Sequence, residues 1–310
     1  MNGYMNGIIN IYKPKGITSH DVVYKIRKLC GTKRVGHAGT LDPMATGVLP
    51  VLVGNACAAQ EYIMEHDKTY IAGIRFGTVT DTGDITGEVL KTSDNIPDAK
   101  TIKQIGESFV GDMKQVPPMY SAIKIGGKKL YELAREGISI EREQRDITVY
   151  SSKMLEKVND TDYYFEFSVS KGTYIRTLGE DIGEKIGCGA TLFSLERTVC
   201  GKFNKENSHT LEQLTETAEK EGSMALEKIL LPAELSFLHL QQIKLPEFYS
   251  KLCKNGLEIY FAKIGNPQIS VGEKVRLYDN SGEFFAIGEV GEFKDGIAVK
   301  ARVRFDTVRK

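Results

Sequence analysis

The sequence predicts a mixed α+β protein with a smaller β-rich domain at its C-terminal end. Strand and helix patterns alternate irregularly through residues 1–230, without the regular strand–helix–strand rhythm of a doubly wound parallel sheet. From about residue 270 onward, short strand patterns are separated by turn residues. The chain has 310 residues, and because single cores stop growing at roughly 250–300 residues, two domains are expected.

The N-terminal region predicts a strand, a helix and a glycine-rich segment. Residues 8–12 form a short apolar run that ends at the turn 13–16. Ser19 is a candidate N-cap, because the apolar residues that follow it have the spacing of one helix face. The helical pattern ends near Gly31, and the segment 36–47 is rich in glycine.

Two strands and a second helix are predicted in the middle of the chain. Residues 70–76 alternate between two faces, and residues 163–170 form a second strand pattern. Thr173 is a candidate N-cap for a helix that stops at Gly187. Arg176 then falls in the first helical turn, where a cation opposes the helix dipole by roughly 0.3–1 kcal/mol. A carboxylate partner would offset this cost; an ordinary surface arginine is the alternative.

The C-terminal region predicts three strands, over residues 275–278, 284–290 and 297–305. In the last of them, Lys300, Arg302 and Arg304 share one face. Such a row of cations could follow a phosphate backbone, or it could simply protect an edge strand from aggregation. Both interpretations remain open on the sequence.

The overall charge does not indicate a nucleic-acid partner, whereas its distribution leaves room for one. There are 41 basic and 41 acidic residues, so the net charge is zero, which alone counts slightly against nucleic-acid binding. Residues 1–60, however, contain seven lysines and arginines against two aspartates, a local charge of +5. A local basic surface can attract phosphates even on a neutral molecule, although chance clustering on a solvated face is the alternative.

Several classes of site are not predicted. The five cysteines include no CxxC pair, so neither a zinc site nor a disulfide framework is indicated. There is no phosphate-loop, dinucleotide-binding or zinc-hydrolase motif, and we expect no metal and no cofactor. No signal pattern is present and no apolar run approaches the ~20 residues of a membrane span. We therefore expect a reducing, cytoplasmic setting and no membrane association.

The densest group of unusual features is the segment 36–49, GHAGTLDPMATGVL. Its small residues allow a backbone or a substrate to approach closely. His37 and Asp42 are the only ionisable residues in it. The dipeptide Asp42-Pro43 alone is a common turn, so the interpretation depends on the whole string.

This string resembles the signature of the TruB family of tRNA pseudouridine synthases, and further blocks match in the same order over residues 8–205. The matching blocks are Lys13-Pro14 with Gly16-Ile17-Thr18-Ser19, Lys68-Thr69-Tyr70, Thr80-Asp81-Thr82-Gly83-Asp84, Val116 to Ala122 with Lys124, Lys171 to Arg176, and Gly187 to Ala190 with Leu195 to Thr198. The resemblance implies a pseudouridine synthase fold, with a central mixed β-sheet flanked by helices and loops, over residues 1–234. It also implies a small PUA-like RNA-binding domain over residues 235–310.

The reaction implied by the resemblance is the isomerisation of uridine 55, in the T loop of tRNA, to pseudouridine. A uridine stacked in that loop must be flipped out before its glycosidic bond can be reached, at a cost of about a few kcal/mol. Asp42 would be the covalent nucleophile. The sequence leaves open whether it attacks ribose C1′ or base C6, or abstracts a ribose proton.

The resemblance also implies partners for the nucleophile. Arg176 would pair with Asp42, and Asp84 would belong to the same charge network. Tyr70 would stack on the flipped uracil and take up the C5 proton; its position in a strand pattern makes core packing the alternative. Asp42, Tyr70 and Arg176 are thus the expected catalytic residues.

Three more residues match family positions that bind substrate beside Tyr70. Tyr174 and Leu195 would contact the base, although a leucine at 195 could equally belong to the core. His37 would fill the space left by the flipped base or contact the T loop, although a lone histidine is more often structural.

Basic residues supply the candidates for RNA contact. The segment from about residue 118 to 147 resembles the family's mobile thumb loop, which orders over bound RNA. It contributes Lys124, Lys128 and Lys129, and the N-terminal block contributes Lys13.

Three functions differ in class: a stand-alone enzyme, a non-catalytic RNA-binding or tRNA-folding protein, and a guide-RNA-dependent synthase within a protein complex. Intact Asp42, Tyr70 and Arg176 argue against the second as the sole role. The chain lacks long basic extensions, which favours a stand-alone monomer acting on tRNA without an obligate protein partner. One departure is Glu196, where many relatives carry a basic residue, and a weaker local phosphate contact is expected there.

Overall fold

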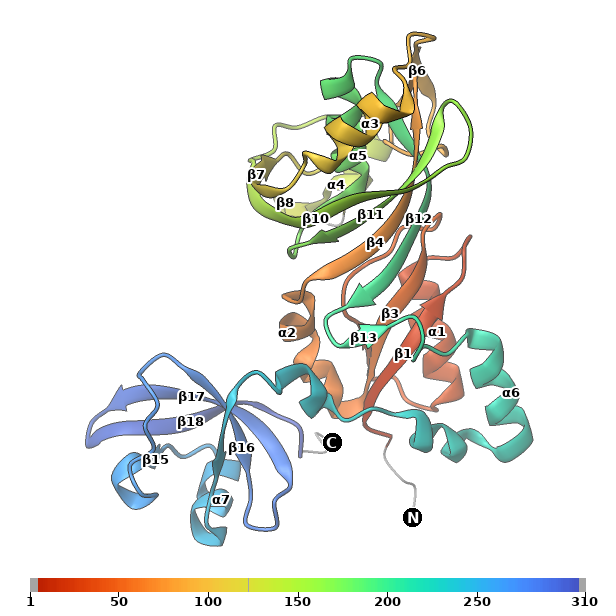
Figure 1. Ribbon diagram of the computed structural model, residues 1–310. Coiled ribbons are helices and arrows are strands. Elements are labelled where there is room, and N and C mark those ends of the chain that lie inside the picture. Colours follow the sequence, from red (N-terminus) through yellow and green to blue (C-terminus); the bar gives the residue numbers. More distant parts are fainter. Residues whose placement is uncertain (1–4, 122, 307–310) are drawn as a thin grey trace.

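The computed structural model describes residues 5–121 and 123–306, and its larger part is built on one mixed sheet (Figure 1). The strands, in their order across the sheet, are β1 (Gly7–Lys13), β3 (Thr46–Val53), β12 (Ala190–Cys200), β4 (Lys68–Phe76), β11 (Asp162–Val169), β10 (Arg145–Lys157) and β7 (Gly111–Gln115). Two short strands extend it, since β2 (Val35–His37) pairs with β3, and β13 (Phe203–Asn204) pairs with β12. Neighbours are antiparallel except β3 and β12, which are parallel. The predicted mixed sheet is confirmed.

Helices gather at two places along this sheet. The longer ones are α1 (Ser19–Leu29), α3 (Ala99–Glu107), α5 (Ile175–Ile186) and α6 (Leu211–Glu221). Helix α1 contacts α6 near the β1 end, and α3 contacts α5 near β10 (Figure 1). The remaining elements of this part are η1 (Gly54–Ala59), α2 (Gln60–Met64), β5 (Thr78–Thr80), β6 (Val89–Thr92), β8 (Lys124–Ile125), β9 (Lys128–Lys129), α4 (Leu130–Arg135), η2 (Ser223–Ile229) and η3 (Ala233–Phe237). None of the helices described is both long and apolar enough to cross a membrane.

Helix α1 forms where the apolar spacing predicts it, but its cap differs from the expected one. Thr18 is the N-cap, and it forms a capping box with Asp21. The predicted cap, Ser19, is the first helical residue, and its hydroxyl exchanges hydrogen bonds of 3.0 and 2.9 Å with the backbone of Leu41. The start of α1 is therefore tied to the segment that carries Asp42.

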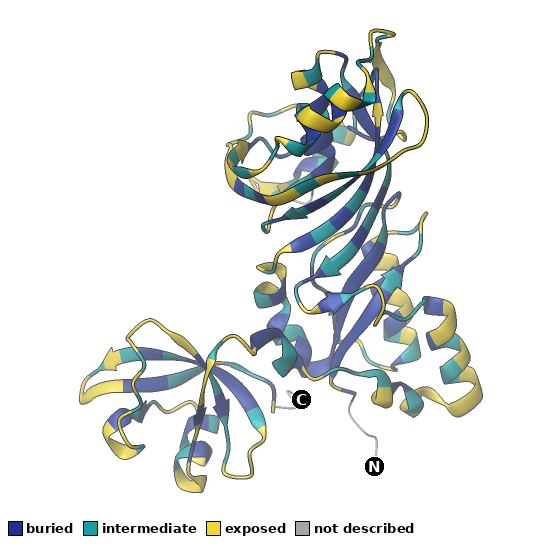
Figure 2. Cartoon of the chain, viewed as in Figure 1, coloured by how far each residue is buried: buried dark blue, intermediate teal, exposed yellow. Residues whose placement is uncertain are grey.

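Strand β3 explains why the segment after Asp42 contains so many apolar residues. All of its residues from Gly47 to Val53 are buried, because the strand is covered on both faces, which favours a continuous apolar run over alternation. Figure 2 shows burial concentrated along the central strands and exposure on the outer surfaces of helices and hairpins. The glycine-rich segment thus leads directly into the core.

Helix α5 also confirms its prediction with a shift at the N-terminus. Tyr174, not Thr173, is the N-cap, and the helix ends at Gly187, whose φ of +93° is left-handed. Arg176 is the second helical residue and lies in the first turn, as expected.

The C-terminal part forms its own five-stranded sheet, in the order β14 (Gln241–Lys244), β16 (Lys274–Tyr278), β17 (Phe284–Phe293), β18 (Gly296–Arg304) and β15 (Ile259–Tyr260). It also contains α7 (Glu247–Lys254) and η4 (Phe261–Lys263). The three predicted strands are confirmed, and β17 runs three residues further than expected.

The row of cations on β18 does not form a free basic surface. Lys300 lies 3.6 Å from Glu258, Arg302 lies 3.0 Å from Glu289, and Arg304 lies 3.1 Å from Asp306. Because each cation has a carboxylate partner, a phosphate track is disfavoured. The edge-strand interpretation does not hold either, since β18 pairs with β17 on one side and with β15 on the other.

An apolar cluster joins the two sheets. Leu52 and Ala56 from the larger part share it with Phe237, Phe284 and Phe305. At the same place the Asn55 side chain donates to the Phe305 carbonyl at 2.9 Å. The C-terminal sheet is therefore packed against the strand that follows the Asp42 segment.

Candidate active site

Two glycines shape the segment that carries Asp42. Gly39 and Gly47 have φ values of +86° and +106°, a region that other residues rarely adopt. A Cβ on Gly47 would lie 2.2 Å from the Arg197 carbonyl oxygen, and one on Gly39 would lie 3.2 Å from the Arg197 guanidinium. Both ends of the segment thus require glycine because they lie against Arg197.

Asp42 and Arg176 form an ion pair at the surface of the larger part. The Arg176 Nε lies 3.0 Å from an Asp42 carboxylate oxygen, and the arginine side chain is 5% exposed while that of the aspartate is 36% exposed. The other guanidinium nitrogens donate to the carbonyls of Thr82 at 2.9 Å and Tyr120 at 2.6 Å. The arginine is fixed by three bonds, so it holds the partly exposed carboxylate in one orientation.

The protonation of Asp42 depends on opposing influences. Burial raises the pKa of its carboxyl above the usual value, the Arg176 charge lowers it, and the Asp84 charge raises it again. Asp84 itself is buried and accepts a hydrogen bond from the Thr86 amide at 2.9 Å. No ion pair joins Asp84 to Arg176 among the described residues, and the effect of Asp84 on Asp42 is that of its charge.

Tyr70 lies in the middle of the sheet, beside the ion pair. It is 8% exposed and stands opposite Phe167 on β11 and Arg197 on β12. Burial raises the pKa of its hydroxyl, the charge of Arg197 lowers it, and the charge of Asp42 raises it. Because the net shift is upward, the hydroxyl is protonated at neutral pH.

Leu195 and Tyr174 border the same region from different elements. Leu195, on β12, is 7% exposed and stands opposite Ala72 on β4. Tyr174 precedes α5, and Gln115 fixes its backbone by accepting from its amide at 2.8 Å and donating to its carbonyl at 3.1 Å. No sequence pattern indicated Gln115, which is the buried last residue of β7.

His37 is a neutral group in this structure. Burial, followed by the charges of Arg197 and His20, lowers the pKa of its imidazole to about 4. Its Nδ1 atom is buried without a hydrogen-bond partner among the described residues. Any contact that His37 makes with RNA is therefore one of shape and hydrogen bonding and not of charge.

Lys13 does not occupy the position expected of an RNA contact, and that expectation is wrong for this structure. Its side chain is fully buried, and its ammonium donates to the carbonyls of Ile17 at 2.7 Å and Pro14 at 2.9 Å. Burial lowers its pKa to about 8. In the same turn the Gly16 amide donates to the Pro43 carbonyl at 2.7 Å, so Lys13 stabilises a turn that supports the Asp42 segment.

The expected thumb loop is a folded hairpin and helix anchored to the site. Strands β8 and β9 pair across Gly126 and Gly127, whose φ values are +59° and +87°, as a two-residue type I′ turn requires. At its base Arg142 donates to the Pro117 carbonyl at 3.0 Å, and Tyr120 accepts the bond from Arg176 described above.

The three lysines of the thumb loop differ in their surroundings. Lys124 and Lys128 are exposed, and Lys128 lies 3.5 Å from Glu136. Lys129 is less exposed, and its ammonium donates to the Tyr131 hydroxyl at 3.2 Å. Lys124 and Lys128 are thus the more accessible candidates for phosphate contact.

Two further residues were not found from the sequence. Arg197 is the largest fully buried side chain described, and it lies in the matching block Leu195 to Thr198, where no role was assigned to it. Glu180 lies one turn after Arg176 on α5, and burial raises its pKa to about 7, against the effect of Arg176. Neither position is apparent without the tertiary contacts.

Glu196, the departure from the family pattern, is neutralised locally. Its carboxylate accepts from the Tyr12 hydroxyl at 2.7 Å and lies 2.6 Å from the Lys205 ammonium. The expected loss of a positive charge at this place is therefore partly offset by Lys205.

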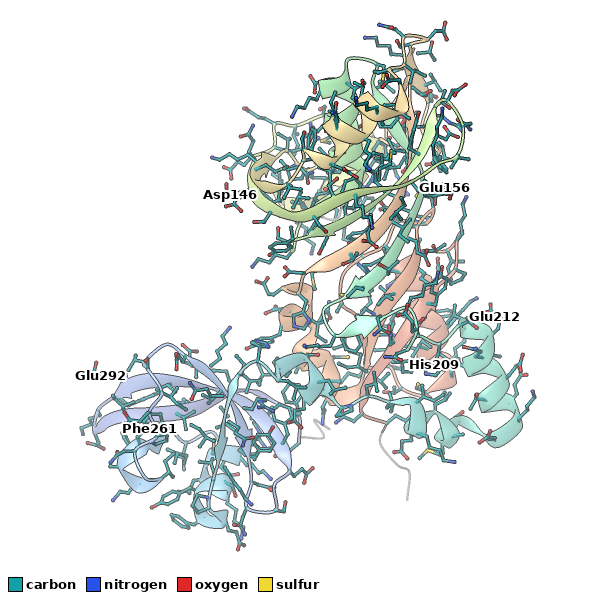
Figure 3. All side chains as sticks on the ribbon, viewed as in Figure 1. Asp146, Glu156, His209, Glu212, Phe261 and Glu292 are labelled. Carbon is teal, nitrogen blue, oxygen red and sulfur yellow. The ribbon has the colours of Figure 1, made fainter. Side chains whose placement is uncertain are left out.

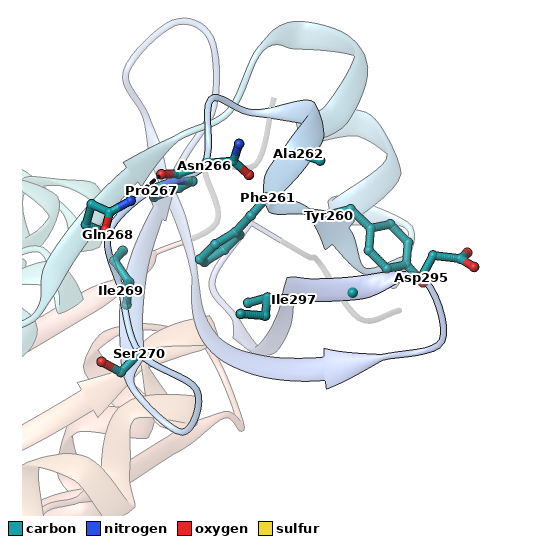
Figure 4. Close-up of a pocket in the computed structure, with 11 residues that line it drawn as sticks. Tyr260, Phe261, Ala262, Asn266, Pro267, Gln268, Ile269, Ser270, Asp295 and Ile297 are labelled. Carbon is teal, nitrogen blue, oxygen red and sulfur yellow. Dashed lines mark hydrogen bonds between the residues drawn. The ribbon is translucent and has the colours of Figure 1, made fainter.

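Four exposed carboxylates and a surface pocket lie on other elements than those of this site. Four exposed carboxylates, Asp146, Glu156, Glu212 and Glu292, lie on β10, α6 and β17 (Figure 3), and none is on an element that carries Asp42, Tyr70 or Arg176. A pocket of about 540 Å³ lies in the C-terminal part, between the segment 260–270 and the turn 295–297 (Figure 4). Asp295 is its only charged residue, so it does not suit a polyanion.

The chain matches two family profiles in succession. Residues 27–175 match the N-terminal domain of TruB family pseudouridylate synthases. Residues 176–237 match the C-terminal domain of tRNA pseudouridylate synthase B.

Curated relatives match almost from end to end. The chain is 43% identical to tRNA pseudouridine synthase B of Clostridium tetani, over 95% of this chain and 98% of the relative. It is also 43% identical to tRNA pseudouridine synthase B of Clostridium perfringens, over 93% of this chain and 96% of the relative.

Solved structures share the fold of both parts. A Cbf5–Nop10–Gar1 complex contains a chain of 28% identity with a TM-score of 0.75, covering 97% of this chain and 85% of that one. An H/ACA RNP bound to a substrate RNA containing 2′-deoxyuridine contains a chain of 25% identity with a TM-score of 0.74, covering 99% and 87%. With its matched profiles and its near-complete relatives, this chain belongs to the TruB family of pseudouridylate synthases.

Proposed function

We propose that this chain isomerises uridine 55, in the T loop of tRNA, to pseudouridine, with Asp42 as nucleophile. The curated relatives carry the name tRNA pseudouridine synthase B, which supports tRNA as the substrate. The observation that carries the assignment of the nucleophile is the Asp42–Arg176 pair, in which a partly exposed carboxylate is held by a buried arginine.

The residues suggest a division of roles in the reaction. The flipped base would lie over Tyr70, with Tyr174 and Leu195 at its border, and His37 would face the vacated position in the RNA. The N1–C1′ bond breaks, a C5–C1′ bond forms, N1 gains a proton and C5 loses one, so the atoms balance without a cofactor. Asp42 would bond to the substrate while the base rotates, and the Tyr70 hydroxyl would take up the C5 proton as it passes its own proton on toward N1, so that it stays protonated.

Arg176 and Asp84 would set the charge of the nucleophile. An aspartate must be ionised to attack, and burial opposes ionisation here. The guanidinium favours the carboxylate, while the charge of Asp84 adds to the upward shift of the pKa that burial causes. This balance would keep Asp42 ionised and still reactive.

The positive residues of the thumb hairpin would bind the tRNA backbone. Lys124, Lys128 and Lys129 lie on one short hairpin and helix start, which is joined to Arg176 through Tyr120. We expect the hairpin to close over the T stem-loop.

We further propose that the chain acts as a cytoplasmic monomer without a protein partner. The structural neighbours include chains from assemblies with Nop10 and Gar1, so a guide-RNA-dependent complex is the alternative. The relatives of 43% identity that match nearly the whole chain favour the stand-alone enzyme. The five free cysteines suit a reducing compartment.

A tritium-release experiment tests the proposed activity. Unmodified T-arm RNA labelled at uracil C5 is incubated with the purified chain and with Asp42→Asn, which preserves shape and removes the charge. We expect release by the native chain and none by the variant. No release by the native chain, with RNA binding retained, would leave a binding protein; release only after addition of a guide RNA would favour the alternative complex.

A further inference from the structure

A buried arginine lies behind the proposed site and has no role in the function proposed so far. The Arg197 side chain is 1% exposed, and its Nε and Nη2 donate to the carbonyls of Val48 at 2.7 Å and Gly39 at 3.1 Å. These two carbonyls belong to opposite ends of the segment that contains Asp42. One guanidinium thus holds both ends of the segment from inside the fold.

The backbone of Arg197 contacts the same segment. It pairs with Gly47 across the parallel contact between β12 and β3. A side chain on Gly47 would collide with the Arg197 backbone, and one on Gly39 would press on its guanidinium. The segment is therefore fitted to this residue at both glycines.

The third neighbour of the guanidinium is the proposed base-stacking tyrosine. Arg197 and Tyr70 are directly opposite one another in the β12–β4 pairing. Burial raises the pKa of the Tyr70 hydroxyl, and the charge of the arginine opposite it lowers that pKa. The Arg197 side chain thus bonds to both ends of the Asp42 segment, and the same residue stands opposite Tyr70 in the sheet.

The electrostatic setting makes this residue unusual. No ion pair to Arg197 occurs within residues 5–121 and 123–306, and its charge lowers the pKa of both His37 and Lys13 nearby. A buried cation without a carboxylate partner is unfavourable. An apolar residue here would avoid that cost but would leave the carbonyls of Val48 and Gly39 without these donors, so the value of the guanidinium lies in the bonds that it makes to the Asp42 segment.

We propose that Arg197 is a positioning residue that fixes both ends of the Asp42 segment and presents its remaining guanidinium edge to the Tyr70 hydroxyl. This inference rests on the proposed function. Lysine can replace the charge but cannot reach Gly39, Val48 and Tyr70 together. Methionine replaces neither the charge nor the hydrogen bonds.

The test compares Arg197→Lys and Arg197→Met with the native chain in tritium release from T-arm RNA, across pH 5–10. We expect Arg197→Met to lower kcat by about 100-fold with KM changed less than about threefold, because the RNA-facing surface is untouched. In the pH profile of kcat for Arg197→Met, the alkaline limb should move to higher pH, because the variant lacks the cation that lowers the pKa of Tyr70. Arg197→Lys should recover kcat at least about tenfold over Arg197→Met and keep the native limb.

A control in the other sheet separates this role from the loss of any buried arginine. Arg276 pairs with Glu234 at 3.0 Å, and its side chain is 13% exposed. Arg276→Met should lower the melting temperature and leave kcat and the pH profile unchanged.

Each outcome is decisive. If Arg197→Met does not fold, Arg197→Lys still supports the proposal by a kcat loss of about tenfold with unchanged KM. The proposal is overturned if the folded Arg197 variants keep kcat within about threefold of native, or if both lose it equally without a shift of the alkaline limb. Absence of release by the native chain would instead overturn the proposed function.

Discussion

At the scale of single residues, the main feature of the site is the unequal burial of its ion pair. Arg176 is fixed by bonds to Asp42, Thr82 and Tyr120, whereas the Asp42 carboxylate reaches the surface. A buried arginine holds its partners in a fixed geometry, because its planar guanidinium is rigid and always charged. The carboxylate is thereby oriented without losing access to substrate.

Arg176→Lys is expected to lower kcat by about 100-fold, because one ammonium cannot keep three partners in the geometry that the guanidinium provides. With the pair weakened, burial dominates and the pKa of Asp42 rises, so the acid limb of the kcat profile should move to higher pH. The profile is measured by tritium release between pH 4 and 9.

Arg75 offers a matched control for this substitution. It makes a bidentate pair with Asp162, at 2.8 and 2.7 Å, on the same sheet but away from Asp42. Arg75→Lys should leave kcat and the acid limb unchanged. An Arg176→Lys enzyme with a native acid limb would contradict the proposed control of Asp42 by this arginine.

His37 allows a prediction about stability. The pKa of its imidazole is about 4 in the folded chain, against about 6.5 when unfolded, so unfolding takes up a proton as pH falls below 6.5. The stability associated with a neutral His37 is complete above pH 6.5 and is lost as pH falls toward 4. Between pH 7 and 5 the native chain should lose about 2 kcal/mol more free energy of unfolding than His37→Gln.

Urea unfolding at the two pH values measures this difference, since all other titrating groups are shared. His209→Gln is a suitable control, because it replaces a histidine on a different part of the chain. Equal pH dependence of native protein and His37→Gln would show that the imidazole is not held neutral.

The sequence predicted the residues that form a continuous motif better than those that depend on tertiary contacts. Asp42 and Arg176 were expected to pair, and they do, at 3.0 Å. Gln115 and Arg197 were missed because their polar atoms are satisfied by backbone groups far along the chain. Lys13 was misplaced because a lysine beside a turn has no sequence signal that distinguishes an exposed ammonium from a buried one.

At the scale of elements, the strands and helices followed their periodic patterns, and their ends did not. Helix α1 is capped by Thr18 and α5 by Tyr174, each one residue from the expected cap. At α1 two adjacent hydroxyl residues could cap the helix, and the contact of Ser19 with Leu41 decides between them. A local pattern cannot contain that long-range contact.

The thumb hairpin provides a prediction at this scale. Lys124→Gln with Lys128→Gln removes the two exposed charges while preserving the Gly126–Gly127 turn. T-arm affinity should fall, and the slope of log K against log salt should decrease by about 1 for each phosphate that the variant no longer neutralises. Once the RNA is bound, kcat should be retained, because the bond between Arg176 and Tyr120 is unaffected.

The control variant changes two exposed lysines that lie on helices outside the thumb hairpin. Lys220 on α6 and Lys251 on α7 are 74% and 70% exposed and each pairs with a glutamate one turn away. Lys220→Gln with Lys251→Gln should keep the native salt slope. An unchanged slope in the thumb variant would remove these lysines from the RNA interface.

At the scale of the whole molecule, zero net charge and RNA binding are compatible, because a total charge does not say which charges pair with one another and which are accessible. The cations of β18 are paired, and the exposed carboxylates labelled in Figure 3 lie on elements other than those of the site. The net charge of the sequence cannot show which charges are paired, because it ignores where each charge lies. Local accessibility at the thumb hairpin is the more informative quantity.

The cluster that joins the two sheets predicts how the molecule unfolds. The Phe237 ring is fully buried and contacts Tyr62 on α2 at 5.3 Å and Phe305 at 5.8 Å, measured between ring centroids. It therefore bridges both parts, and their unfolding should be coupled in a single transition. Phe237→Ala removes this bridge at a cost of about 3–5 kcal/mol and should separate a C-terminal transition from that of the larger sheet.

Differential scanning calorimetry measures the separation directly. Phe248 is 66% exposed on α7, and Phe248→Ala should retain the native single transition because the shared core stays intact. A single transition in Phe237→Ala, with a loss of less than about 1 kcal/mol, would contradict the coupling.

The shared cluster includes Leu52 of β3, the strand that begins four residues after Asp42. Loosening the junction should therefore also reduce kcat modestly, and more than Phe248→Ala does, because the Asp42 segment depends on β3 for its position.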